Sequence, residues 1–176
     1  MKIRVATNQD RAAIQRIHLR AFPESESERV AKLAMDLLAE STTPETLSFV
    51  AETEGAVVGH VALSPVLIAS NQDFRAYILA PLGISPESQK RRIGSKLIEN
   101  GLQRLSLMEV NVVFVYGDPS YYRRFGFSTD VAQQYIPPYK LQYPFGWQAT
   151  VLNQCAIGEA TGAITCVASL SDPALW

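Results

Sequence analysis

The densest group of potentially reactive side chains lies between Ser85 and Lys96. An apolar strand is predicted to end at Ile84, and a strongly amphipathic helix is predicted to begin near Ile93-Gly94. A helix start leaves backbone N–H groups unpaired and carries a partial positive charge, so it attracts anions. Small residues let phosphate oxygens approach the backbone, and cations add attraction; here these residues are Gly94, Ser95, Lys90, Arg91, Arg92 and Lys96.

Two interpretations of this spacing stay open. In one, the loop holds a diphosphate. In the other, it is an ordinary strand-to-helix turn with a solvated basic cluster. A Walker-type phosphate loop is excluded, because the chain contains no GxxxxGK[ST] string.

A second dense segment runs from Val115 to Phe127. Asp118 suits a helix N-cap, Pro119 suits the first helical position, and Gly126 suits the residue that ends a helix. These signals predict a strand, one short helix and a return strand. Taken alone, the two tyrosines at positions 121 and 122 are best interpreted as packing residues.

Local patterns predict the elements that must position both segments. The chain begins with a strand, two amphipathic helices and a hairpin, and continues with a long strand, a helix and a β-branched strand. The first strand is predicted at Ile3–Ala6, followed by a helix capped by Thr7 and a helix with a Ser25-x-x-Glu28 capping box. The hairpin pairs Leu47–Thr53 with Ala56–Leu67 around Glu54-Gly55, with a bend at Gly59. A turn at Asn71–Asp73 then leads to a strand at Arg75–Ile84, a helix from Ile93 and a strand at Val110–Tyr116. This order favours a mixed α/β sheet.

Composition limits the function classes. The 176 residues suit a single domain, with a core at 2–132 and a less diagnostic, β-rich part at 133–176. With 16 basic and 17 acidic residues the net charge is −1, which argues against a nucleic-acid binder. No signal-peptide pattern and no apolar run of about 20 residues is found, so a cytoplasmic protein without membrane contact is expected. Neither Cys155 nor Cys166 has metal-ligand spacing; no metal is expected, and both thiols are predicted to be buried.

The first segment resembles the acetyl-CoA motif of the GCN5-related N-acetyltransferase (GNAT) superfamily. Leu82-Gly83-Ile84-Ser85-Pro86 is similar to the strand end of that motif, and Gln89-Lys90-Arg91-Arg92-Ile93-Gly94-Ser95 is similar to its Q/R-x-x-G-x-G/A string. The resemblance implies that backbone groups of Leu82 and Ile84 pair with the pantetheine arm, and that amides from Gln89 to Ser95 hold the pyrophosphate.

Arg92 departs from the family pattern, which has glycine there. Either the position needs a backbone shape that only glycine tolerates, or it merely avoids a side chain near the phosphates. We favour the second interpretation, because the neighbouring Gly94 is present.

The second segment resembles the G-D-P-x-Y-Y-x-R-F-G-F string of the YhbS-like branch of this superfamily. The resemblance implies that Tyr122, four residues before the Gly-Phe pair, protonates the departing CoA sulfur; Tyr121 is the substitute. An attacking amine must also lose its proton, because lysine-like amines have a pKa of ~10.4. Glu52, His60 and Asp118 are the candidate bases. Of these, His60 is expected to be structural and Asp118 to be a helix cap. Glu52, on the hairpin, could face the acceptor, but so could the neighbouring Glu54.

The resemblance covers residues 2–127 and implies a mixed, mostly antiparallel sheet flanked by helices, in which two parallel strands splay apart to admit CoA. It implies an acetyl-CoA-dependent N-acetyltransferase acting by direct attack in a ternary complex. The acceptor would be an amine of a small molecule or peptide, and the protein a monomer or homodimer. The alternative is a non-catalytic acyl-CoA sensor or partner-binding module.

Overall fold

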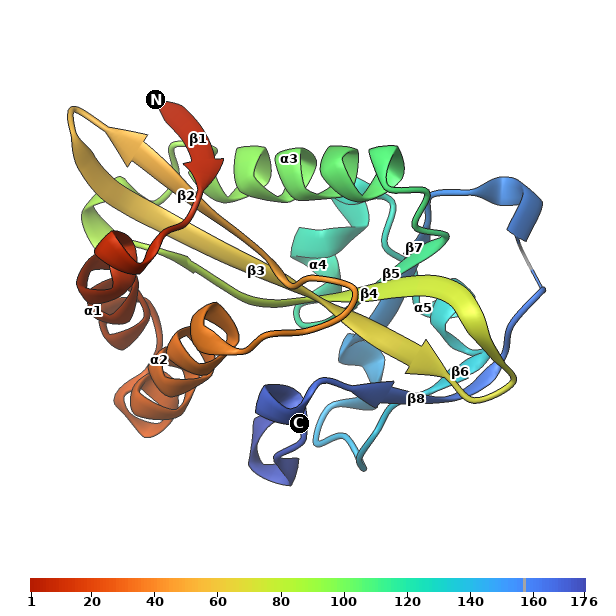
Figure 1. The fold of residues 1–176 in the computed structure, drawn as a ribbon. Coiled ribbons are helices and arrows are strands. Elements are labelled where there is room, and N and C mark those ends of the chain that lie inside the picture. Colours follow the sequence, from red (N-terminus) through yellow and green to blue (C-terminus); the bar gives the residue numbers. More distant parts are fainter. Residues whose placement is uncertain (157) are drawn as a thin grey trace. The chain divides into compact units, whose positions relative to one another are not determined.

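The computed structural model describes residues 1–156 and 158–176, and the chain divides into two compact units. The first unit comprises Met1–Leu63 and Ala80–Gly101, and the second comprises Ser64–Leu79 and Leu102–Trp176. Three long elements run through both units (Figure 1): strand β3 (Ala56–Ile68), strand β4 (Asn71–Ile84) and helix α3 (Ile93–Leu107).

The first unit is built on three antiparallel strands. β1 (Lys2–Val5) pairs with β2 (Leu47–Thr53), and β2 pairs with β3. The β2–β3 hairpin confirms the predicted one: Glu54 and Gly55 both have positive φ, 53° and 78°, as a tight hairpin turn of matching twist requires.

The predicted bend near Gly59 is also present. Ala51 pairs with Gly59 and Glu52 pairs with Val57, so β3 carries one extra residue, Val58, at a bulge.

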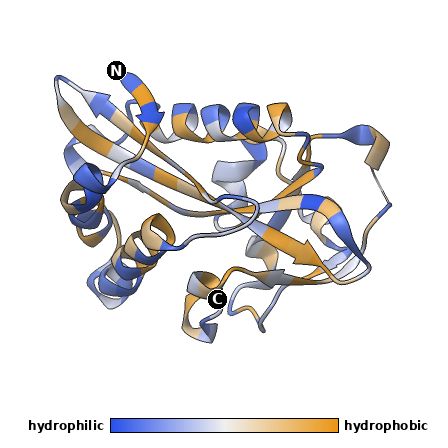
Figure 2. Ribbon diagram, in the orientation of Figure 1, coloured by the Kyte–Doolittle hydropathy of each residue, from blue (hydrophilic) through white to orange (hydrophobic). Residues whose placement is uncertain are grey.

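Helices cover both faces of these strands (Figure 1). On one face α1 (Arg11–Ala21) and α2 (Glu24–Ala39) pack with Ile14, Ala34 and Met35 around Val50. On the other, the space beside Gly59 is filled by Ile84 and by the first turns of α3. Apolar and polar residues alternate around α2, while much of β3 is apolar, consistent with helices that shield a central sheet (Figure 2).

Helix α2 begins at Glu24, so Ser25 lies inside the helix and the predicted Ser25–Glu28 capping box is wrong. Pro23 is the N-cap instead, and its carbonyl accepts from the amides of Glu26 and Ser27. The extended backbone of Pro23 already turns its carbonyl into the helix, so the start lies upstream of Ser25.

The second unit contains the parallel pair of the sheet. β4 pairs with β5 (Val112–Tyr116) from Ala76↔Val112 to Ile78↔Phe114, and β5 pairs antiparallel with β7 (Trp147–Val151). β4 is also hydrogen-bonded to β3. β3 pairs antiparallel with β8 (Gly162–Cys166), and β8 pairs parallel with β6 (Tyr135–Ile136). The short helices are α4 (Pro119–Tyr122) and α5 (Thr129–Ala132). The predicted fold class, mixed α/β with a mostly antiparallel sheet, is confirmed.

Two local predictions in this unit are wrong. β4 begins at Asn71, because the chain reverses at Ala69-Ser70 and the residues after it already belong to the strand. Cys166 is buried, but Cys155 lies in a 3-10 turn after β7 and is exposed to solvent. No helix in the described part of the chain has both the length and the apolar character needed to cross a bilayer.

Candidate active site

The loop between β4 and α3 is anchored at several points. The Ser85 amide donates to the carbonyl of Val58 (2.9 Å), and the Gln89 side-chain amide donates to the carbonyl of Ile84 (3.2 Å). Glu87 forms an ion pair with Arg20 in the last turn of α1, which lowers the pKa of the Glu87 carboxyl. The loop is therefore tied to its own strand, to the neighbouring strand and to α1.

The start of α3 presents its first amides without helical partners. The Lys96 amide donates to the carbonyl of Arg92 (3.1 Å), so the amides of Ile93–Ser95 precede this bond. Four exposed cations surround this point, and none forms an ion pair within the described residues: Lys90, Arg91, Arg92 and Lys96. Unpaired amides and uncompensated positive charge together favour an anion.

Lys90 and Arg92 both adopt left-handed backbone conformations, with φ of 61° and 62°. Position 92 does take a backbone shape that glycine tolerates best, but Arg92 adopts it, so the shape is not one that only glycine tolerates. The interpretation that position 92 merely avoids a side chain near the phosphates stays a prediction. Arg92 accepts the shape with its side chain exposed. A left-handed conformation costs a residue with a side chain about 1–2 kcal/mol. The loop contains two such residues, Lys90 and Arg92.

At the end of β4, Gly83 faces α1. A Cβ at this position would lie 2.7 Å from both Nδ1 and Cε1 of His18 and 3.3 Å from Ile17. Any side chain here would displace α1, so tertiary packing explains this glycine independently of ligand binding. Leu82 and Ile84, on either side, are half-buried.

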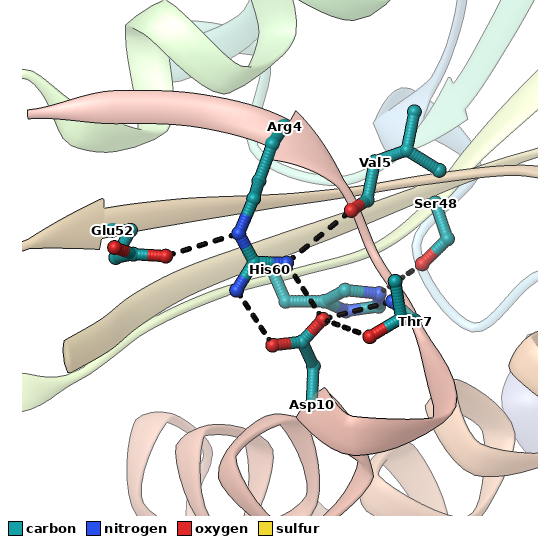
Figure 3. A network of polar contacts seen from close by, with 7 residues as sticks. All are labelled: Arg4, Val5, Thr7, Asp10, Ser48, Glu52 and His60. Atoms are coloured by element: carbon teal, nitrogen blue, oxygen red, sulfur yellow. Dashed lines mark hydrogen bonds and ion pairs between the residues drawn. The ribbon is translucent and has the colours of Figure 1, made fainter. Parts of the chain in front are cut away.

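Glu52 belongs to a polar network on β1 and β2 (Figure 3). Its Oε2 accepts from Nε of Arg4 at 3.0 Å, and Arg4 also makes a two-pronged ion pair with Asp10, at 2.8 Å for each bond. Asp10 further accepts from the Thr7 amide, and the Arg4 guanidinium holds the pKa of Asp10 at about 2. Glu52 thus has one carboxylate oxygen committed to Arg4.

His60 is fully buried and bonded at both ring nitrogens. Its Nε2 lies 2.8 Å from Oγ of Ser48, seen in Figure 3, and its Nδ1 lies 2.8 Å from Nε2 of His18 on α1. Burial lowers the pKa of His18 to about 4 and that of His60 well below its usual range, with a further effect of His18 on His60. The structural role expected for His60 agrees with these bonds.

His18 is not among the residues predicted from the sequence. One signal was available: Ile14, Ile17 and His18 fall at i, i+3 and i+4, which places the imidazole on the apolar face of α1. Its partner on β3 could not be found this way, because 42 residues separate the two rings.

Tyr122 lies in the second unit, at the end of α4. Asp118 caps this helix by accepting from the Ser120 amide at 2.8 Å, as predicted. The Tyr122 ring packs edge-on against Phe127 and lies over Gly117, where a Cβ would come 2.6 Å from the ring.

Burial, with smaller effects of Tyr121 and Asp118, raises the pKa of the Tyr122 phenol. No residue in the described chain hydrogen-bonds its hydroxyl.

The predicted site residues are thus distributed over both units. The first unit brings together the strand end and loop, Leu82–Ser95, and also holds Glu52 and His60; the second holds Tyr122 and Asp118. Among the described residues, no three His, Cys, Asp or Glu side chains converge as metal ligands.

Comparisons with known proteins agree with these features. Residues 2–129 match the family model described as an acetyltransferase (GNAT) domain. The chain is 31% identical over 175 residues to the uncharacterized N-acetyltransferase YjhQ of Escherichia coli K12, covering 92% of this chain and 95% of YjhQ. It is 35% identical over 128 residues to the uncharacterized N-acetyltransferase YhbS of the same strain, covering 72% and 73%.

Two solved structures are also similar. The E. coli YhbS structure in complex with CoA superposes with a TM-score of 0.80 at 29% identity, over 93% of this chain and 87% of that one. A GNAT acetyltransferase from Brucella melitensis in complex with acetyl-CoA superposes with a TM-score of 0.68 at 31% identity, over 86% and 88%.

Proposed function

Because this chain belongs to the GNAT family of acetyltransferases, we propose that it moves the acetyl group of acetyl-CoA to an amine of a small molecule or peptide. The observation that carries the proposal is the start of α3, where unpaired amides and four uncompensated cations follow directly on β4. A diphosphate is the anion that suits a surface of this charge and extent.

The proposed cosubstrate contacts follow the chain. The pantetheine arm would lie along the backbone at the end of β4, at Leu82, Gly83 and Ile84. The pyrophosphate would bind the loop, at Gln89, Lys90, Arg91, Arg92, Ile93, Gly94 and Ser95. The Ile84 carbonyl already accepts from Gln89, so this carbonyl exchanges or shares its donor when the arm binds.

The proposed reaction is direct attack in a ternary complex. The neutral amine nitrogen bonds to the thioester carbonyl carbon, an amide of the Leu82–Ile84 stretch stabilises the oxyanion, and the carbon–sulfur bond then breaks. Tyr122 gives its phenolic proton to the leaving thiolate. The phenol is protonated in the neutral range already at its ordinary pKa of ~10, and the raised pKa makes it a weaker donor than a free tyrosine.

Removal of the amine's own proton needs a separate base. Glu52 is the carboxylate that the sequence suggests, and its Oε1 is left over after the bond from Arg4 to Oε2. Protonation of Glu52 would give up part of its ion pair with Arg4.

Thermal unfolding with and without acetyl-CoA tests the first step. Ligand at about 100 times its Kd should stabilise the protein by ~2.7 kcal/mol. Absence of any shift with acetyl-CoA and with CoA would contradict the proposal. Thiol release against a panel of amines then separates an enzyme from a non-catalytic acyl-CoA sensor, which binds but releases no thiol.

A further inference from the structure

The loop before α3 carries a single carboxylate, and that carboxylate is paired with a cation outside the loop. Between positions 80 and 98 the one acidic residue is Glu87. Lys90 and Arg91 follow it by three and four residues, yet Glu87 is paired with Arg20, which is 67 residues away on α1. The four cations around the start of α3 form no ion pair among the described residues. The choice of the distant partner over the near ones therefore requires an explanation.

The backbones that carry this pair are fixed on both sides. Glu87 lies in a 3-10 turn, Pro86–Ser88, whose last amide donates to the carbonyl of Ser85 at 2.8 Å. The Ser85 amide in turn donates to a carbonyl of β3. Arg20 lies in the last turn of α1, two residues after His18, whose ring packs against the end of β4. The pair therefore joins two elements that are already anchored to the same strands.

The charges of the loop explain the arrangement. From Ser85 to Lys96 the chain carries four positive charges and one negative charge. An unpaired carboxylate at Glu87 would repel a diphosphate, and it would also form ion pairs with the neighbouring cations that a diphosphate needs. Arg20 prevents both effects, because it neutralises this carboxylate and holds it on α1.

We propose that Arg20 is a positioning residue for the cosubstrate: it holds the Glu87 carboxylate on α1, so that the cations at the start of α3 stay free for the diphosphate. The inference rests on the proposed function, which places the pyrophosphate of acetyl-CoA at this loop. Arg20 acts through Glu87 and takes no part in the reaction itself. Without Arg20, the Glu87 carboxylate competes with the diphosphate for Lys90 and Arg91, and the affinity for acetyl-CoA falls.

The exposure of the pair makes this role separable from stability. The side chain of Arg20 is 51% exposed and that of Glu87 is 60% exposed. Ion pairs at such exposed positions contribute little to folding, because water solvates both groups when they separate. Substitutions at these two positions therefore test binding, and thermal unfolding without ligand verifies that each variant is folded.

A double-mutant cycle measured by titration calorimetry tests the proposal. Arg20→Ala should raise the Kd for acetyl-CoA about five-fold at an ionic strength of about 0.01 M, as expected for a free carboxylate about 8 Å from two phosphate charges in water. Glu87→Gln alone should change the Kd by less than about two-fold, because the carboxylate is already neutralised. In the Arg20→Ala background, however, Glu87→Gln should restore the wild-type Kd.

The cycle separates this role from direct binding of a phosphate by Arg20. Direct binding would give Glu87→Gln the same effect in both backgrounds, and the double variant would then bind more weakly than Glu87→Gln by the full Arg20→Ala effect. That additive result would overturn the proposal, and so would an unchanged Kd in Arg20→Ala. At about 1 M salt the difference between Arg20→Ala and the wild type should vanish, because charges are then screened within about 3 Å.

Two further variants are matched controls. Arg20→Lys keeps the positive charge and should hold the Kd within about two-fold of the wild-type value. Arg16→Ala removes an exposed cation one turn earlier on α1, which forms no ion pair in the described part of the chain. It should leave the Kd unchanged. An equal rise in Kd for Arg16→Ala and Arg20→Ala would show that only the total charge of α1 matters, and would overturn the proposal.

Inorganic pyrophosphate, titrated into the wild type and the three variants of the cycle, keeps this inference distinct from the proposed function. If pyrophosphate follows the cycle but neither acetyl-CoA nor CoA binds, the positioning role is supported and the proposed function is contradicted. If acetyl-CoA binds and thiol is released but the cycle is additive, the proposed function is retained and the positioning role is excluded. A protein that binds neither pyrophosphate nor acetyl-CoA contradicts both.

Discussion

Tyr122 has a half-buried ring held by Gly117 and Phe127, and a hydroxyl that no described residue engages. If it is the acid for the leaving thiolate, Tyr122→Phe should lower kcat by about 10²–10⁴-fold while the Kd for acetyl-CoA stays unchanged. Thiol-release kinetics and calorimetric binding measure the two quantities.

Tyr121→Phe is the matched control, because it removes the same hydroxyl from the adjacent ring. Wild-type turnover by Tyr122→Phe across the pH range would exclude the acid role. Activity lost in Tyr121→Phe alone would transfer the role to that residue.

Arg92 shows how a backbone conformation and a side-chain charge can favour different residues at one position. Arg92→Gly should raise the melting temperature by about 2–4 °C, since it relieves a left-handed residue in a chain of this size. The same substitution should weaken acetyl-CoA binding, because it removes a cation from the start of α3. Differential scanning calorimetry and ligand titration give both values.

Arg91→Gly is the comparison, as this neighbour has the same charge without the positive φ. Arg91→Gly should also weaken acetyl-CoA binding. In contrast to Arg92→Gly, it should lower the melting temperature, because glycine there only increases the entropy of the unfolded chain. Equal thermal responses of the two variants would contradict the argument from backbone strain.

At the scale of elements, the contact between β3 and α3 fixes the loop. A Cβ on Gly59 would lie 2.8 Å from Cδ1 of Ile84 and 3.1 Å from Ile93 and Leu97. Gly59→Ala should therefore cost about 1–3 kcal/mol in the free energy of unfolding, as overpacked cores do. Because Ile84 and Ile93 flank the loop, acetyl-CoA affinity should fall as well.

The double variant Gly59→Ala/Ile84→Val removes the methyl group that collides and should recover part of both losses. Denaturant unfolding and ligand titration of the single and double variants complete the cycle. No recovery would show that the strain arises elsewhere.

At the scale of the whole molecule, the buried imidazoles make stability depend on pH. Unfolded histidine binds a proton below pH ~6.5, whereas folded His18 does so only near its pKa of about 4. The unfolded state therefore holds more protons in this window, and the free energy of unfolding should fall as the pH drops from 6.5 to 4, by about 3 kcal/mol from His18. Urea unfolding at a series of pH values measures this slope.

His18→Gln should flatten that slope, while Asp10→Asn should leave it unchanged. The low pKa of Asp10 acts in a separate window, between its ordinary value near 4 and about 2, where protonation breaks the pair with Arg4. An unchanged slope in His18→Gln would mean that other groups cause the acid sensitivity.

The family and the order of elements could be predicted because their signals are local. The hairpin turn at Glu54-Gly55, the loop into α3 and the Asp118 cap each depend on neighbours within a few residues, so adjacent residue types determine them. Cosubstrate contacts, the acid role of Tyr122 and the single-domain organisation stay predictions.

Only the tertiary structure decided which distant side chains meet. Strand register brings Arg4 to Glu52 across 48 residues, and the packing of α1 on the sheet brings His18 to His60 and Gly83. No local pattern encodes such contacts, because they depend on a register and a helix position that the whole core selects. At position 92 the sequence shows that arginine replaces the family glycine. Only the folded loop shows that the Arg92 backbone has a left-handed conformation.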